Sequence, residues 1–87
     1  MKIILVYDVG EKRVQKVLKT CRKYLKWVQN SVFEGEITQA NLEKLKLELQ
    51  NIINKDEDSI IIYIFKINWY NSREIIGLDK NKQDMFL

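Results

Sequence analysis

The chain has 87 residues, of which 46% are hydrophobic and 31% are charged, and its formal net charge is +3. This length and composition fit one globular domain with a modest core, and no apolar run approaches the roughly 20 residues of a membrane-spanning helix. The absence of histidine and the single cysteine exclude an imidazole base and a zinc ribbon. Because the chain starts directly in a strand pattern and Cys21 falls on an apolar helix face, we expect a cytoplasmic protein with no secretory signal.

The first element is an uncharged run over residues 3–7 that ends at Asp8. Its residues favour strands and are apolar on both faces, which is typical of a strand that is covered on both sides. A carboxylate at the end of such a strand is stable when it pairs with a cation or stays hydrated. The residues alone leave two interpretations of Asp8: an ion pair with Lys12 or Arg13, or a ligand of a divalent metal.

The next segment carries most of the positive charge. Apolar residues recur at helical spacing over about residues 11–24, which predicts an amphipathic helix. Residues 1–33 hold eight Lys or Arg and two acids, whereas residues 34–87 hold seven and ten. This asymmetry favours a polyanion partner such as nucleic acid, and a solvated helix surface is the alternative. The cations of this helix and its exit are Arg13, Lys16, Lys19, Arg22, Lys23 and Lys26.

A hairpin follows the basic helix. Residues 27–29 and 32–37 predict two strands, with a turn at Asn30 and Ser31. Gly35 lies inside the second strand, where glycine indicates a bulge or a close approach of backbone.

The second half of the chain repeats the helix and strand pattern. Thr38 is the predicted N-cap of a helix that ends near residue 54. An acidic turn over residues 55–58 precedes an apolar strand over residues 59–65, and a short strand is predicted near residues 73–76, stopped by Gly77.

The order of these elements predicts the fold class. A β-α-β-β-α-β order with an extra short C-terminal strand is the ferredoxin-like arrangement of the α+β class. We therefore predict a single domain over residues 1–77 and a C-terminal tail over residues 78–87.

The predicted sheet has more apolar surface than its helices can cover. Two helices cover one face, yet the strand that ends at Asp8 and the strand over residues 59–65 are apolar on both faces. The uncovered face predicts a homodimer. Asp8 lies on the side that would face the second copy, so two Asp8 carboxylates would approach each other. Such a pair has the oxygen ligands that Mg²⁺ or Mn²⁺ uses to promote phosphodiester hydrolysis.

Three segments resemble the small CRISPR-associated Cas2 protein family. They are residues 6–9 with the cations behind them, residues 27–38, and the acidic turn and strand over residues 56–63. The likeness extends from residue 2 to about residue 77. It implies a ferredoxin-like homodimer that acts in CRISPR adaptation (spacer acquisition), bridges the CRISPR integrase and binds double-stranded spacer DNA. It also implies a Mg²⁺-dependent endonuclease that cleaves RNA or DNA.

The resemblance assigns roles to individual residues. It matches Asp8 to the catalytic metal ligand that each protomer contributes. It places Lys12 and Arg13 on the phosphates of nucleic acid and places Ser31 and Phe33 near the site. The charge pattern of the first helix adds Lys16 and Lys19 to the predicted nucleic-acid contacts.

The sequence departs from the commonest family pattern at two positions. Leu25 stands where a glycine is frequent, and Trp27 stands where an arginine is frequent, so one cationic contact is missing. We therefore expect a nucleic-acid-binding scaffold as the principal role, with endonuclease activity secondary. A ribonuclease toxin of the virulence-associated type, which has a similar fold, is the alternative.

Overall fold

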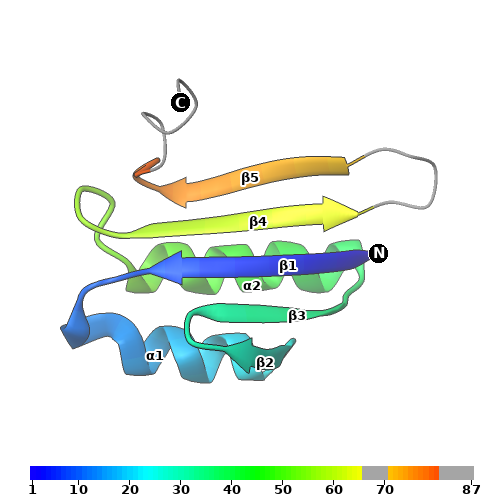
Figure 1. The fold of residues 1–87 in the computed structure, drawn as a ribbon, viewed down its shortest axis with the longest axis horizontal. Helices are drawn as coiled ribbons and strands as arrows, with labels where there is room; N and C mark the ends of the chain where they lie inside the picture. Colours follow the sequence, from blue (N-terminus) through cyan, green and yellow to red (C-terminus); the bar gives the residue numbers. More distant parts are fainter. Residues whose placement is uncertain (66–70, 81–87) are drawn as a thin grey trace.

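The computed structural model describes residues 1–65 and 71–80. The described residues form five strands and two helices. The strands make one sheet in the order β2-β3-β1-β4-β5, and all neighbouring strands are antiparallel. Figure 1 shows both helices on the same face of the sheet. This arrangement confirms the predicted ferredoxin-like α+β class. The elements are β1 (Lys2–Asp8), α1 (Glu11–Arg22), β2 (Lys26–Gln29), β3 (Val32–Glu36), α2 (Gln39–Ile52), β4 (Ser59–Phe65) and β5 (Asn71–Gly77).

The central strand β1 supplies the middle of the core. Side chains alternate across a strand, so Ile3, Leu5 and Tyr7 point toward the helices and are buried. Leu5 lies opposite Phe33 on one side and Ile62 on the other. The helices contribute apolar residues to the same cluster, including Val17, Cys21, Leu42, Leu45 and Leu49.

Cys21 is a core residue, as the helical spacing predicted. Its side chain is fully buried, and this burial raises the pKa of the thiol to about 12. The thiol therefore stays protonated and unreactive at neutral pH.

The sheet face opposite the helices is not covered by any other element of the described residues (Figure 1). Ile4 pairs with Tyr63 on this face and both are partly buried, while Phe65 is 38% exposed. The expected apolar surface is therefore present, and the homodimer that would cover it stays a prediction. None of the described helices combines the length and the apolar composition that crossing a membrane requires.

The fifth strand is longer than its sequence predicted. A short strand was expected near residues 73–76, but β5 has seven residues and pairs with β4 along its whole length, from Asn71 opposite Phe65 to Gly77 opposite Ser59. Backbone pairing with the apolar strand β4 overrides the weak strand preference of the first residues of β5, because strand propensity depends strongly on context.

The hairpin bulge lies elsewhere than predicted. It falls in β2 between Trp27 and Gln29, whereas Gly35 pairs in register with Ile3. The close neighbour of Gly35 is a side chain, because a Cβ at this position would lie 3.2 Å from Leu25 Cδ2, whereas the backbone Cα of Leu25 would be at an ordinary contact distance of 3.6 Å. The turn at Asn30 is confirmed, and Asn30 adopts a positive φ of 42°.

Candidate functional site

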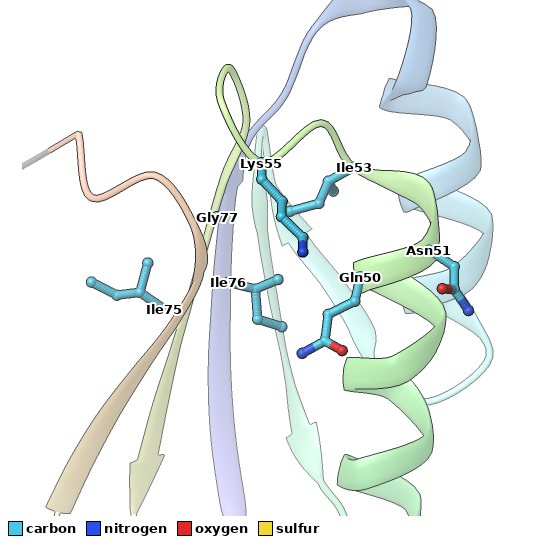
Figure 2. Close-up of a pocket in the computed structure, with 7 residues that line it drawn as sticks. All are labelled: Gln50, Asn51, Ile53, Lys55, Ile75, Ile76 and Gly77. Atoms are coloured by element: carbon cyan, nitrogen blue, oxygen red, sulfur yellow. The ribbon is translucent and has the colours of Figure 1, made fainter.

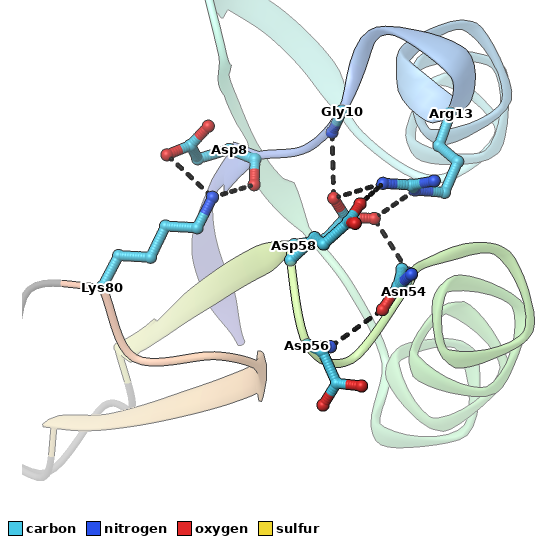
Figure 3. Close-up of polar contacts among 8 residues, drawn as sticks. Asp8, Gly10, Arg13, Asn54, Asp56, Asp58 and Lys80 are labelled. Atoms are coloured by element: carbon cyan, nitrogen blue, oxygen red, sulfur yellow. Dashed lines mark hydrogen bonds and ion pairs between the residues drawn. The ribbon is translucent and has the colours of Figure 1, made fainter.

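Asp8 lies at the end of β1, with its side chain 73% exposed. Its Oδ2 lies 3.3 Å from Nζ of Lys80, and the same Nζ donates a hydrogen bond of 3.4 Å to the backbone carbonyl of Asp8 (Figure 3). The sequence suggested Lys12 or Arg13 as the ion-pair partner, and this was wrong. The sequence-based prediction chose cations close to Asp8 along the chain, whereas Lys80 reaches Asp8 from the segment after β5.

A second carboxylate, Asp58, lies just before β4 and is fully buried. It accepts hydrogen bonds from the backbone N–H of Gly10 at 2.9 Å and of Asn54 at 2.9 Å. It also accepts two from Arg13, from Nε at 2.5 Å and from Nη2 at 3.0 Å (Figure 3). The hydrogen bond from Arg13 is the main reason that the pKa of Asp58 is lowered to about 2, against the opposing effect of its burial.

Arg13 is therefore held inside the protein fold. Besides Asp58, its Nη2 contacts Glu57 Oε2 at 2.9 Å, and its side chain is only 21% exposed. The hydrogen bond with Asp58 is also the main cause that raises the pKa of Arg13. The role of Arg13 on phosphates stays a prediction, and a phosphate would have to compete with two carboxylates for this guanidinium.

Sequence reasoning missed Asp58 as a partner of Arg13. The acidic turn before an apolar strand was visible in the sequence, but three acids in a row do not indicate which one turns inward. The signal that distinguishes Asp58 is its position directly before β4, because a residue next to a buried strand is more readily buried than one farther out in the turn. Asp56 and Glu57, two residues and one residue earlier, are exposed.

Besides Arg13, the cations of α1 and its C-cap residue Lys23 fall into two groups. Lys23 forms an ion pair with Glu48, which also accepts a hydrogen bond of 2.5 Å from the hydroxyl of Tyr24. Four other cations are exposed and form no ion pair with any residue in the described part of the chain. Their spacings of four, three and three residues place them on one face of the helix. This basic face consists of Lys12, Lys16, Lys19 and Arg22.

Ser31 and Phe33 lie beside the same end of β1. The carbonyl of Ser31 accepts a hydrogen bond of 3.0 Å from the backbone N–H of Tyr7, next to Asp8. Phe33 is fully buried, and its ring lies 6.1 Å from the ring of Tyr7. Both residues therefore support the strand that carries Asp8, and the ring of Phe33 is enclosed in the core.

Trp27 is presented at the surface of the hairpin. Its side chain is 54% exposed, and its indole N–H donates a hydrogen bond of 2.9 Å to the carbonyl of Asn30. The bond fixes the ring on the turn, and stacking on a base stays a prediction.

A pocket of about 460 Å³ lies between the end of α2 and the end of β5 (Figure 2). Isoleucine side chains, two side-chain amides and Lys55 line it. It contains no acid and none of the residues that the sequence placed in the site, so we do not assign a reaction to it.

The carboxylate of Asp8 is the type of ligand that Mg²⁺ or Mn²⁺ prefers, but one protomer supplies too few such ligands. Within residues 1–65 and 71–80, no group of three or more Asp, Glu, Cys or His side chains could hold a metal ion. Mg²⁺ commonly uses one or two protein carboxylates and keeps several water or phosphate oxygens. One protomer supplies Asp8 alone, so the fit depends on a second Asp8 from another copy.

The antiparallel five-stranded sheet with two helices on one face places this chain among the small ferredoxin-like α+β proteins. Within this class, residues 1–73 match the family model described as "CRISPR associated protein Cas2". The chain belongs to the Cas2 family. The family resemblance of the sequence is thereby confirmed.

Curated relatives and solved structures agree with this family. A protein of Dictyoglomus turgidum is 54% identical over 87 residues, covering 100% of both chains. One from Methanocaldococcus jannaschii is 54% identical over 84 residues, covering 97% of this chain and 74% of the relative. Both are named CRISPR-associated endoribonuclease Cas2.

Two crystal structures show the same fold. One, described as a crystal structure of Cas2, has a TM-score of 0.74 and 45% identity, and the match covers 92% of this chain and 90% of that one. The other is Streptococcus pyogenes Cas2 at pH 6.5, with a TM-score of 0.70, 39% identity, and coverage of 79% of this chain and 90% of that one.

Proposed function

We propose that this protein is a CRISPR adaptation protein that works as a homodimer, binds nucleic acid through α1 and bridges the CRISPR integrase. The observation that carries the proposal is the basic face of α1, which is exposed and free of ion pairs within the described residues. Family membership supports a role in CRISPR systems over the ribonuclease toxin.

Electrostatic binding of nucleic acid depends on which cations of the helix lack a carboxylate partner. A lysine that has no carboxylate partner can neutralise a phosphate and release its condensed counterions, and this release drives binding. Lys12, Lys16 and Lys19 meet that condition, whereas Lys23 is already paired with Glu48. The predicted contact surface is thus the exposed side of α1.

The bridging role follows from symmetry. A two-fold homodimer presents every surface twice, so it can hold two copies of the same integrase contact. The apolar sheet face that neither described helix covers, which includes Ile4, Tyr63 and Phe65, supports dimerisation through the sheet.

Binding through α1 is tested by charge reversal. In the double variant Lys16→Glu, Lys19→Glu, we expect affinity for duplex spacer DNA to fall at least tenfold and the salt slope to become less steep by about 2. Fluorescence anisotropy over a series of NaCl concentrations measures both. The double variant Lys44→Glu, Lys55→Glu changes the net charge equally with two exposed lysines outside α1. Equal losses in the two variants, or no loss in either, would contradict the assigned surface.

A second candidate activity is metal-dependent endonuclease action on RNA or DNA. The supporting observation is the exposed carboxylate of Asp8, on the side of β1 that faces away from the helices. The two Asp8 side chains of a homodimer would hold Mg²⁺ or Mn²⁺, which, when bound, polarises a phosphodiester and lowers the pKa of a water molecule. The basic face of α1 would orient the substrate by its phosphates.

The endonuclease proposal is tested with labelled RNA and labelled duplex DNA, with and without Mg²⁺. We expect the Mg²⁺-dependent cleavage of the wild type to disappear in Asp8→Ala while sedimentation still shows a dimer, because Asp8 is the proposed metal ligand of each protomer. The exposed Asp56→Ala is the matched control and should cleave like the wild type. Undiminished cleavage by Asp8→Ala would rule out Asp8 as the metal ligand.

A further inference from the structure

Lys80 occupies the cation position at Asp8. Its ammonium group lies 3.3 Å from the carboxylate Oδ2 and 3.4 Å from the backbone carbonyl oxygen of Asp8. One cation thus contacts two oxygens of the same residue, and oxygens are the ligands that Mg²⁺ and Mn²⁺ prefer. In Figure 3, the side chain of Lys80 extends from the segment after β5 to the end of β1.

The backbone before Lys80 is anchored so that the side chain reaches this position. The N–H of Leu78 donates a hydrogen bond of 2.9 Å to the carbonyl of Asp58. Gly77 has a φ of +94°, and a Cβ there would lie 2.3 Å from the same carbonyl oxygen, so only glycine fits this close approach. Arg73 also holds Asp79 at 3.5 Å. The end of β5 is therefore fixed against the turn before β4, beside the end of β1.

We infer that Lys80 is a built-in counter-ion of Asp8 that competes with a divalent metal and sets the metal affinity of the site. A metal at Asp8 has to displace the ammonium group, because two cations cannot share the same oxygens without strong repulsion. Lys80 lies beyond residues 1–73, which match the family model. The inference rests on the proposed metal-binding role of Asp8.

The size of the effect follows from the exposure of the pair. Asp8 is 73% exposed and Lys80 is 32% exposed, so the ion pair is a surface pair. Such pairs shift an equilibrium by roughly 1.4-fold to fivefold. A metal shared by two protomers displaces two of them, so removing the charge of Lys80 should tighten metal binding about twofold to thirtyfold.

The experiment is calorimetric titration of the full chain with MnCl₂, which requires no nuclease activity. We expect Lys80→Gln to bind Mn²⁺ about twofold to thirtyfold more tightly than the wild type, and Lys80→Arg, which keeps the charge, to stay near the wild type. Lys44→Gln removes the same charge from an exposed position on α2 and should change the affinity little. Thermal melting and sedimentation confirm that each variant is folded and has the oligomeric state of the wild type.

The outcomes separate this inference from the proposal beneath it. If the wild type binds Mn²⁺, Asp8→Ala does not, and Lys80→Gln matches the wild type, the counter-ion role of Lys80 is overturned and the metal role of Asp8 stands. A gain in Lys44→Gln equal to that in Lys80→Gln would also overturn it, because net charge alone would then explain the gain. If no variant shows binding that depends on Asp8, both the metal role and the counter-ion role fail.

Discussion

Asp8 and Asp58 lie at the same end of the sheet, because Asp8 ends β1 and is paired with Ser59, the residue after Asp58. Asp58 is fully buried and accepts four hydrogen bonds from the protein. The side chain of Asp8 is 73% exposed, and within the described residues its carboxylate forms an ion pair only with Lys80. The same chemical group therefore has two opposite environments within one end of the molecule.

The comparison shows how the environment of a carboxylate decides its role. A buried carboxylate must keep its partners, since a buried charge that lacks them is strongly destabilising. Asp58 thereby joins the loop after β1, the first turn of α1 and the turn before β4. Asp8 has oxygen lone pairs open to solvent, and its partner is a flexible lysine that another cation can replace. Asp58 stabilises the site, and Asp8 is available to bind.

The largest expected difference between the two acids is in stability. Asp58→Ala should lower the free energy of unfolding by about 3 to 5 kcal/mol, because it leaves the partly buried guanidinium of Arg13 without its main acceptor. It also removes the acceptor of the N–H groups of Gly10 and Asn54. Urea denaturation at a fixed protein concentration measures the change, since dimerisation makes stability depend on concentration.

Asp8→Ala is the matched control for this experiment. It removes the same side chain from the neighbouring strand end, but only an exposed ion pair is lost, so the change should stay within about 1 kcal/mol. A loss in Asp8→Ala as large as that in Asp58→Ala would mean that exposure does not separate the two roles.

The sequence predicted the fold well because the relevant signals are local. The spacing of apolar residues defines both helices, and the runs that end at Asp8 and at Phe65 are too apolar to be anything but inner strands of the sheet. The order of elements then leaves few topologies, and the ferredoxin-like arrangement is one of them. The N-cap is local too, since Oγ1 of Thr38 accepts a hydrogen bond of 3.1 Å from Asn41.

The partners within the candidate site are not local, and the sequence could not supply them. Arg13 and Asp58 are 45 residues apart, and Asp8 and Lys80 are 72 residues apart. Each pair depends on how neighbouring strands bring their ends together. The sequence interpretation therefore paired Asp8 with the nearest cations, Lys12 and Arg13. The predicted exposure of Lys16 and Lys19 needed only the helical period, and it is confirmed.

A smaller expected difference is the response to acid. The pKa of Asp58 is about 2 in the folded protein, below its ordinary value of 3.8. A group with a lowered folded pKa adds stability above its unfolded pKa and loses that contribution as the pH falls through the folded pKa. Between pH 5 and pH 2, Asp58 should therefore lose about 2 kcal/mol of its contribution to the free energy of unfolding.

Asp58→Asn isolates this contribution, because an amide does not titrate over this range and all other carboxylates are unchanged. The gap in unfolding free energy between the wild type and Asp58→Asn should be largest at pH 5 and shrink by about 2 kcal/mol at pH 2. Denaturation curves at half-unit pH steps measure it. A gap for Asp58→Asn that does not depend on pH would show that Arg13 does not hold this carboxylate in its charged form.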